Sequence, residues 1–200
     1  CPPGVFNLIN GDGPCVGEAI TNHPDIHMIS FTGSTRAGKA ITKGAADTIK
    51  RVTLELGGKS PNLLFADANL AEAAKISVDA CFINNGQSCD AASRLLVERS
   101  VYEEVVDLVT AEVTSVKVGD PMVEGTHIGP VVNKRQFDNI QKLIKVGIDE
   151  GATLAVGGLG LPHGFNKGYY IRPTLFTDVK NDMAIAQNEV FGPVLSIIPF

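Results

Sequence analysis

The sequence lacks any apolar run long enough to cross a membrane. Its longest apolar stretches, such as residues 195–198 and 63–66, fall far short of the roughly 20 residues that a membrane-spanning helix needs. The 200-residue chain is nevertheless 44% hydrophobic with a mean hydropathy of +0.13, so it can bury a substantial core. We therefore expect a globular protein without a membrane segment.

An excess of basic charge is also missing. Seventeen Lys and Arg residues are scattered among 22 Asp and Glu residues, giving a net charge of -5. No basic stripe is available to neutralise phosphates, so we expect no nucleic-acid partner. Nothing in the charge pattern points to a charged surface partner either.

Cysteine is scarce, and its spacing is not that of a metal site. The four histidines add no ligand pattern, so we expect no metal. This usage suits a reducing, intracellular compartment better than a disulfide framework, and we predict a cytoplasmic protein. The four cysteines are Cys1, Cys15, Cys81 and Cys89.

Apolar runs of strand length alternate with amphipathic stretches of helix length, which is the rhythm of βαβ units with a largely parallel sheet. The predicted class is therefore α/β. An extended run at 5–9 precedes predicted strands at 26–31, 52–56, 62–66, 95–97, 154–156, 169–175 and 194–198, with helices at 15–21, 35–46, 70–82, 101–115 and 134–150.

Gly57 and Gly58, followed by Pro61, interrupt this pattern and predict a domain boundary. Residues 1–57 have the pattern of the later part of a Rossmann-like, nucleotide-binding sheet, and residues 58–200 form a second α/β domain. The chain starts at Cys1 without a methionine and stops inside an apolar run. We expect it to be a stretch of something longer.

Small and hydroxyl residues, from Gly33 and Ser34 to Gly38, join a predicted strand to a predicted helix. Free backbone N–H groups and the positive end of the helix dipole suit a phosphate or pyrophosphate there. The spacing matches neither GxGxxG nor GxxxxGK[ST]. An ordinary Ser- or Thr-capped helix start is the alternative.

Cys89 lies in the polar, glycine-containing segment 84–90. A thiolate is a strong nucleophile toward a carbonyl carbon, and backbone N–H groups in such a loop suit a developing oxyanion. The alternative is a small buried side chain, the commonest fate of a lone cysteine. Cys81, on an apolar helix end, is predicted to be of that buried kind.

Two acidic residues complete the candidate site. Glu55 interrupts an apolar strand just before the Gly-Gly turn; it is a candidate general base, or else a solvent-facing strand residue. Glu189 joins Phe191 and a Gly-Pro turn. The carboxylate suits hydrogen bonds from a ribose diol, with the phenyl ring packed nearby. The alternative is that the segment only holds a loop in place.

Taken together and in order, these motifs resemble the aldehyde dehydrogenase superfamily over essentially the whole chain. The matching stretches are PGVFN from Pro3, FTGST followed by Gly38 and Lys39, ELGGK from Glu55, NGQ leading to Cys89, and the ExFGP pattern from Glu189. The 34 residues that separate Glu55 from Cys89 also look like the family's spacing. The resemblance favours Cys89 as nucleophile over the buried alternative.

The resemblance implies oxidation of an aldehyde to a carboxylic acid with reduction of NAD or NADP. Cys89 would form a thiohemiacetal and then a thioester, and Glu55 would activate the hydrolytic water. Gly33, Ser34, Leu56, Glu189 and Phe191 would contact the cofactor. A homo-oligomer, dimer or tetramer, is implied for the full-length protein.

The resemblance also implies that an oxyanion-hole asparagine and a cofactor lysine precede Cys1, so we expect the 200-residue chain alone to be inactive. Two alternatives remain open. One is a semialdehyde or glyceraldehyde-phosphate relative with an anionic substrate, which Asp90 next to Cys89 disfavours unless it merely caps a helix. The other is a noncatalytic cofactor-binding relative, which would be expected to lose Cys89 or Glu55.

Overall fold

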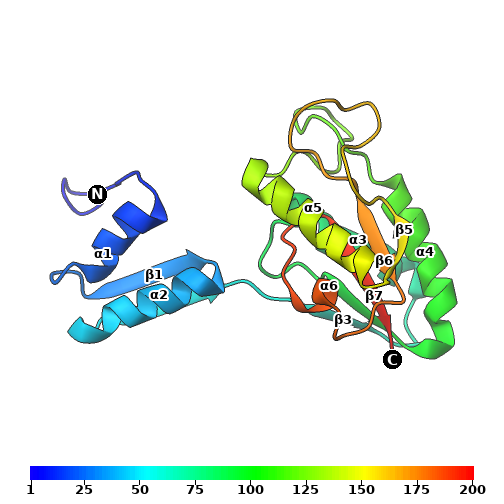
Figure 1. The fold of residues 1–200 in the computed structure, drawn as a ribbon, viewed down its shortest axis with the longest axis horizontal. Coiled ribbons are helices and arrows are strands. Elements are labelled where there is room, and N and C mark those ends of the chain that lie inside the picture. The colour runs from blue at the N-terminus through cyan, green and yellow to red at the C-terminus, as the bar shows by residue number, and fades with distance from the viewer. The chain divides into compact units, whose positions relative to one another are not determined.

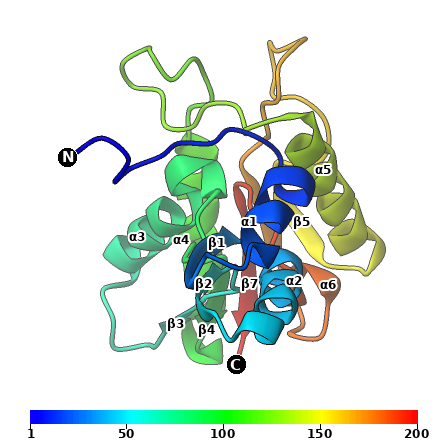
Figure 2. The same ribbon diagram turned by 90° about the vertical axis from the view of Figure 1, so that its left-hand side faces the viewer.

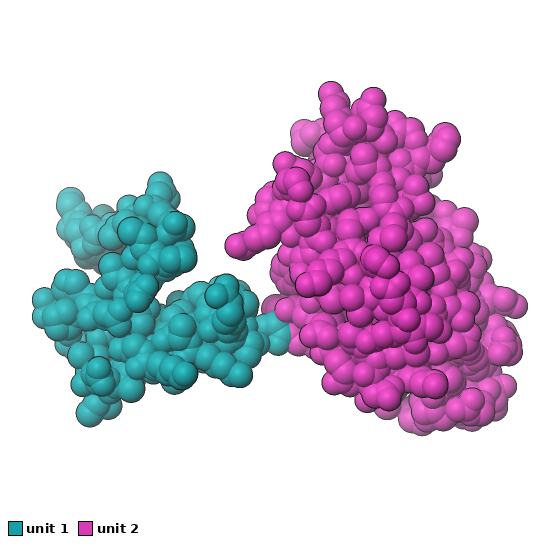
Figure 3. Space-filling model, in the orientation of Figure 1, with its two compact units in different colours: residues 1–57 teal, residues 58–200 magenta.

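A computed structural model describes residues 1–200. The chain forms two compact units, Cys1–Gly57 and Gly58–Phe200, which are coloured separately in Figure 3. The assignment of the first unit to cofactor binding and of the second to catalysis stays a prediction. Each unit is described by itself below.

The first unit is built on a two-stranded parallel sheet, β1 (Met28–Gly33) and β2 (Arg51–Leu56). Parallel strands need a crossover, which α2 (Thr35–Ala45) and a short 3₁₀ turn, η2 (Ala46–Thr48), provide. Gly38 allows α2 to approach the sheet, because a Cβ there would lie 2.8 Å from a methyl group of Leu56. Figure 2 shows α2 beside these strands.

The predicted helix at 15–21 is partly right. A π-helical turn, η1 (Gly13–Gly17), leads into the short helix α1 (Glu18–Asn22), and the Asp12 carboxylate accepts a hydrogen bond from the Cys15 N–H at 2.8 Å. The run at 5–9 forms no strand, and the apolar side chains of Val5, Phe6, Leu8 and Ile9 are exposed. A strand needs a neighbour for its N–H and C=O groups, and no strand pairs with this run.

The second unit contains a five-stranded sheet in the order β3-β4-β7-β6-β5. All neighbours run parallel except β5 and β6, so the predicted α/β class with a largely parallel sheet is confirmed. The strands are β3 (Pro61–Leu64), β4 (Arg94–Val97), β5 (Thr153–Val156), β6 (Thr174–Thr177) and β7 (Val194–Pro199).

The predicted strand at 169–175 is wrong in most of its length, since β6 begins only at Thr174. Pro173 has no N–H to donate to a neighbouring strand, and the Tyr169 carbonyl accepts a hydrogen bond from the Val131 N–H instead. β6 itself is buried at all four positions, so it carries no alternation that marks a strand. The short helix α6 (Ala184–Gln187) was not predicted.

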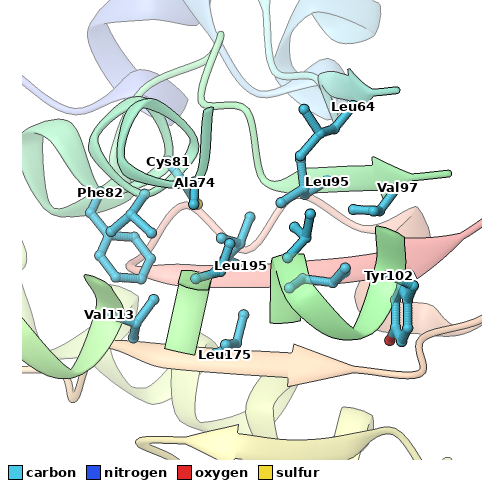
Figure 4. Close-up of a cluster of buried hydrophobic side chains, with 14 of the residues drawn as sticks. Leu64, Ala74, Cys81, Phe82, Leu95, Val97, Tyr102, Val113, Leu175 and Leu195 are labelled. Atoms are coloured by element: carbon cyan, nitrogen blue, oxygen red, sulfur yellow. The ribbon is translucent and has the colours of Figure 1, made fainter. Parts of the chain in front are cut away.

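Helices cover both faces of this sheet (Figure 1). α3 (Leu70–Phe82) and α4 (Tyr102–Ser115), the latter preceded by the turn η4 (Arg99–Val101), enclose one core with Leu195 and Ile197 of β7; Figure 4 shows this cluster. α5 (Lys134–Asp149) and α6 enclose a second core with Val194 and Ile198. Alternating β7 side chains thus enter opposite cores, as a doubly covered strand requires.

No helix has the length and apolar character needed to span a membrane. No cluster of three or more His, Cys, Asp or Glu side chains is arranged to hold a metal ion.

Candidate active site

The strand register of the first unit brings two predicted motifs to the same end of the sheet. Gly33 pairs with Leu56, and Thr32 pairs with Glu55, at the carboxyl ends of β1 and β2. Ligands of parallel α/β sheets bind at this end of the strands. Glu55 is exposed there and Leu56 is partly buried.

Ser34 is the N-cap of α2, with its hydroxyl accepting a hydrogen bond from the Ala37 N–H at 3.3 Å. Within this chain, Ser34 therefore acts as a helix cap, which was the alternative to phosphate binding. Its hydroxyl is exposed and still has a proton to donate. An open hollow beside the start of this helix is lined by Thr35, Arg36, Lys39, Ala40 and Lys43. The three basic side chains in this lining place positive charge beside the helix start.

In the second unit, the structure separates the two cysteines of interest. Cys89 is exposed, whereas Cys81 is completely buried on α3. The Cys81 thiol faces the Val194 carbonyl oxygen at 3.6 Å, and burial raises the pKa of this thiol to about 12. The buried alternative thus applies to Cys81 and is wrong for Cys89.

The loop before Cys89 has an unusual backbone that side chains hold in place. In the turn η3 (Ile83–Gly86), Asn84 and Asn85 take left-handed conformations with φ of 51° and 60°, which asparagine tolerates better than most residues. The Asn85 side chain accepts a hydrogen bond from the Gly129 N–H at 2.7 Å and donates one to the Pro130 carbonyl at 3.0 Å.

Gln87 continues this attachment, because its side-chain oxygen accepts a hydrogen bond from the Val132 N–H at 2.9 Å. The loop before Cys89 is thereby fixed to the segment that precedes α5. The amide side chains of the NGQ motif thus position the loop, and local sequence gave no sign of a partner more than 40 residues away.

The same loop packs against the segment that carries Glu189 and Phe191. Gly86 has φ of +70°, and a Cβ on it would collide with the Gly192 carbonyl. Phe191 is itself left-handed, with φ of 54°. Gln136 of α5 donates hydrogen bonds to the carbonyls of Val190 and Phe191 at 3.1 and 2.8 Å, which secures this strained segment.

Gly58 contacts both the Cys89 loop and Glu189. Its N–H donates a hydrogen bond to the Glu189 carboxylate at 3.4 Å, and a Cβ on it would lie 3.4 Å from the Cys89 carbonyl oxygen. Burial raises the pKa of Glu189, although the Gly58 N–H and the charge of Lys59 oppose this shift. Within the second unit, Gly58 thus lies next to both the Cys89 backbone and the Glu189 carboxylate.

Lys59 is a feature that the motifs did not single out as functional. Its ammonium nitrogen is buried and has no hydrogen-bond partner. The pKa of Lys59 is lowered to about 8, mainly by burial and to a smaller extent by the positive charge of Arg94, while Cys81 and Glu189 oppose the shift. A buried ammonium without a hydrogen-bond partner is unusual in a folded protein, so Lys59 calls for an explanation.

Asp90 caps no helix, since the next regular element is the strand β4. It is exposed, and its carboxylate accepts a hydrogen bond from the Ser88 hydroxyl at 2.5 Å. This hydrogen bond, with one from the backbone, lowers the pKa of Asp90. The chain therefore carries a fixed negative charge immediately after Cys89.

Solved structures resemble the chain over almost its entire length. An aldehyde dehydrogenase from Bartonella henselae is 56% identical, with a TM-score of 0.96, and the match covers 98% of this chain and 41% of that one. A Cys-to-Ala mutant of aldehyde dehydrogenase C from Pseudomonas syringae, in complex with NAD⁺ and octanal, is 50% identical, with a TM-score of 0.98, over 100% of this chain and 41% of that one.

Among curated proteins, a 3-succinoylsemialdehyde-pyridine dehydrogenase of a Pseudomonas species is 50% identical over 199 residues, which is 100% of this chain and 42% of that protein. The chain thus spans less than half the length of the relatives it matches. The sequence model of the aldehyde dehydrogenase family matches residues 1–200. The chain belongs to the aldehyde dehydrogenase family.

Proposed function

We propose that the protein containing this chain oxidises an aldehyde to a carboxylic acid with NAD or NADP, and that Cys89 is its nucleophile. One observation carries the proposal: an exposed cysteine lies in a braced loop whose neighbour Gly58 also binds the Glu189 carboxylate. The relatives support it, because the Pseudomonas syringae structure is described as a complex with NAD⁺ and octanal.

In the proposed reaction, the Cys89 thiolate adds to the carbonyl carbon and forms a thiohemiacetal. Its oxyanion is stabilised in part by the Cys89 backbone N–H. A nicotinamide cofactor, when bound, would accept the hydride lost from the thiohemiacetal carbon, and Cys89 would then carry an acyl thioester. Glu55 then takes a proton from water, the resulting hydroxide attacks the thioester carbonyl, and the carboxylic acid and the Cys89 thiolate are released.

We assign the cofactor contacts to both units. Gly33, Ser34 and Leu56 lie at the carboxyl end of the first unit's sheet, where the α2 N–H groups suit the phosphates. Glu189 in the second unit has a carboxylate able to accept hydrogen bonds from a ribose diol, and Phe191 beside it offers an aromatic ring to the nicotinamide. Which of NAD and NADP is preferred is left open by these residues.

An anionic substrate, such as a phosphorylated or carboxylate-bearing aldehyde, is the less favoured version of this function. The ionised Asp90 follows the nucleophile directly and would repel such a substrate. A noncatalytic role is also less favoured, since the chain retains both Cys89 and Glu55. We further propose a cytoplasmic homo-oligomer; the four free cysteines suit a reducing compartment.

The test uses the full-length protein that contains this chain. NADH or NADPH formation is followed at 340 nm with neutral, cationic and anionic aldehydes, octanal among them. The Cys89 peptide is then examined by mass spectrometry after a single turnover in the Glu55→Gln variant. We expect an acyl adduct on Cys89; reduction of the cofactor with an adduct on another residue would contradict the assignment.

A further inference from the structure

Arg94 lies at the start of β4, five residues after Cys89, and its guanidinium bonds to two separate segments. Its Nε donates a hydrogen bond to the Lys59 carbonyl at 3.1 Å, and its Nη1 donates one to the Asn181 side chain at 2.7 Å. The backbone N–H of Arg94 adds a hydrogen bond to the Ser60 carbonyl at 3.3 Å. One residue therefore joins the segment after the Gly-Gly turn to the segment that precedes α6.

Both of these segments lead to Glu189. The first contains Gly58, whose N–H donates a hydrogen bond to the Glu189 carboxylate at 3.4 Å. In the second, the Gln187 side chain donates a hydrogen bond to the Asn181 carbonyl, and Gln187 precedes Glu189 by two residues. The contacts thus form a closed ring that includes both the Arg94 guanidinium and the Glu189 carboxylate.

An ion pair does not explain the arginine in this ring. Arg94 takes part in none of the chain's salt bridges, and both acceptors of its guanidinium are neutral. What distinguishes arginine here is its planar fork, which offers donors in fixed and different directions. Joining two strands would need only one of these donors. The second donor reaches the segment before Glu189, so the fork suits a residue that holds two segments at a set spacing.

The hydrogen bond between Gly58 and Glu189 depends on this spacing. At 3.4 Å it lies beyond the usual range for an N–H donor, so a shift of a few tenths of an ångström in either segment would break it. A carboxylate can accept a hydrogen bond on each of its oxygens, but it accepts from both hydroxyls of a ribose only in one orientation. The spacing that Arg94 sets therefore bears on the predicted cofactor contact.

We propose that Arg94 is a positioning residue, whose guanidinium fixes the Gly58 and Asn181 segments so that the Glu189 carboxylate is oriented toward both hydroxyls of the nicotinamide ribose. This inference rests on the proposed function, because it concerns the cofactor contact assigned to Glu189. It adds a residue outside the predicted set of contacts, one that acts through Glu189.

The experiment compares two ligands of the full-length protein by titration calorimetry, without any aldehyde. One is the cofactor that the protein prefers, NAD⁺ or NADP⁺; the other is the adenosine diphosphate half of the same cofactor, which lacks the nicotinamide ribose. In Arg94→Met we expect the affinity for the whole cofactor to fall roughly tenfold, the scale of one charge-assisted hydrogen bond. The affinity for the half cofactor should not change, because its predicted contacts do not include Glu189.

A merely structural role of Arg94 would give a different result. General damage to the fold would weaken both ligands alike, and a contact that only stabilises the fold would weaken neither; either result would overturn the inference. Arg99→Met is the matched control, because Arg99 is exposed in the same unit, and both affinities should equal those of the parent protein.

Arg94→Lys separates the fork from the charge. Lysine keeps the positive charge but offers a compact ammonium in place of the planar fork, so it should lose most of the affinity that Arg94→Met loses. Parent-like affinity in Arg94→Lys would show that the charge acts and the fork does not, which would overturn the inference.

A double-variant cycle tests whether Arg94 acts through Glu189. In a Glu189→Ala background, Arg94→Met should cause little further loss of cofactor affinity; fully additive losses would overturn the inference. Should Arg94→Met not fold, Asn181→Ala removes one of the two acceptors at an exposed position. It should weaken the whole cofactor but not the half cofactor, and this loss should also disappear in the Glu189→Ala background. Unchanged cofactor affinity in Asn181→Ala would count against the ring.

Failure of the inference is distinguishable from failure of the proposed function. If the parent protein binds neither NAD⁺ nor NADP⁺ and reduces neither with any aldehyde, the proposed function is wrong. If the parent protein binds and turns over normally and Arg94→Met matches it, only the role of Arg94 is wrong.

Discussion

Gly86 and Gly192 pack backbone against backbone, so closely that the Gly86 α-carbon has no room for a methyl group beside the Gly192 carbonyl. Gly86 belongs to the loop that presents Cys89, and Gly192 follows Phe191 in the segment that carries Glu189. This contact fixes the nucleophile loop against the predicted ribose-binding segment. A side chain added at Gly86 should therefore disturb the candidate site without touching a reacting atom.

Gly86→Ala is expected to destabilise the protein by roughly 3 kcal/mol or more, since left-handed strain and overpacking each contribute about 1–3 kcal/mol. Thermal denaturation of the full-length protein measures the loss. Gly125→Ala is the matched control, because Gly125 has φ of +82° and nothing within 4 Å of an added Cβ. Equal losses in the two variants would show that the contact with Gly192 contributes nothing.

The sequence predicted the elements whose apolar pattern is complete within one helix or strand. The predicted helix at 70–82 coincides with α3, where the Asn69 side chain caps the first turn by accepting from the Glu72 N–H. β2 and α5 were placed within one residue at each end. In these cases local propensity, capping and burial all favour the same structure.

The errors occur where tertiary contacts decide the structure. β6 is buried at every position and so lacks alternation, and α6 is only four residues long, too short for a helical period to show. For the candidate site, motif order led to the proposal of Cys89 and Glu189, but it did not reveal Gln136, which holds the Phe191 segment from another helix. It also gave no sign that Lys59 ends in a buried, unpartnered nitrogen.

Cys89→Ala is expected to abolish aldehyde oxidation in the full-length protein, whereas Cys81→Ala should retain most of it, because Cys89 is exposed and Cys81 is buried. Thiol labelling at pH 7.5 provides a second measurement. Cys89 should react readily, while Cys81, buried and with its pKa raised to about 12, should react only on unfolding. Comparable activity losses in both variants would remove the nucleophile assignment.

Glu55→Gln is expected to leave the first hydride transfer in place and to slow thioester hydrolysis by roughly a hundredfold or more, the usual contribution of a general base. Rapid mixing should show a burst of NADH equal to the active sites, followed by slow turnover. Asp47→Asn, on an exposed residue of the same unit, serves as the control. Unaltered steady-state turnover in Glu55→Gln would contradict the base role.

Lys59→Met should make the protein more stable at neutral pH. Burial lowers the pKa of Lys59 from 10.5 to about 8, so between these values the unfolded chain binds more protons and the parent protein gains stability as pH rises. The gain is on the order of 3 kcal/mol. Melting temperatures of parent and variant between pH 7 and 10 should therefore converge; a constant difference would mean that Lys59 is not desolvated.

Asp90→Asn is expected to change the choice of substrate. Ser88 and a backbone group lower the pKa of Asp90, so its carboxylate is ionised at neutral pH beside the nucleophile. In the variant, kcat/KM for an anionic aldehyde should rise roughly three- to tenfold relative to a neutral aldehyde of equal length, and that for a cationic aldehyde should fall, as removal of one nearby exposed charge predicts.

Salt separates this charge effect from a change in loop shape. Because Asp90 is exposed, the preference of the parent protein for cationic over anionic aldehydes should shrink between low and 0.5 M salt, while that of Asp90→Asn should hardly move. Ser88→Ala removes the hydrogen bond to Asp90 but leaves its charge at pH 7.5, so it should keep the parent preference. If Ser88→Ala shifts selectivity as much as Asp90→Asn does, the orientation of the loop and not the negative charge sets the substrate class.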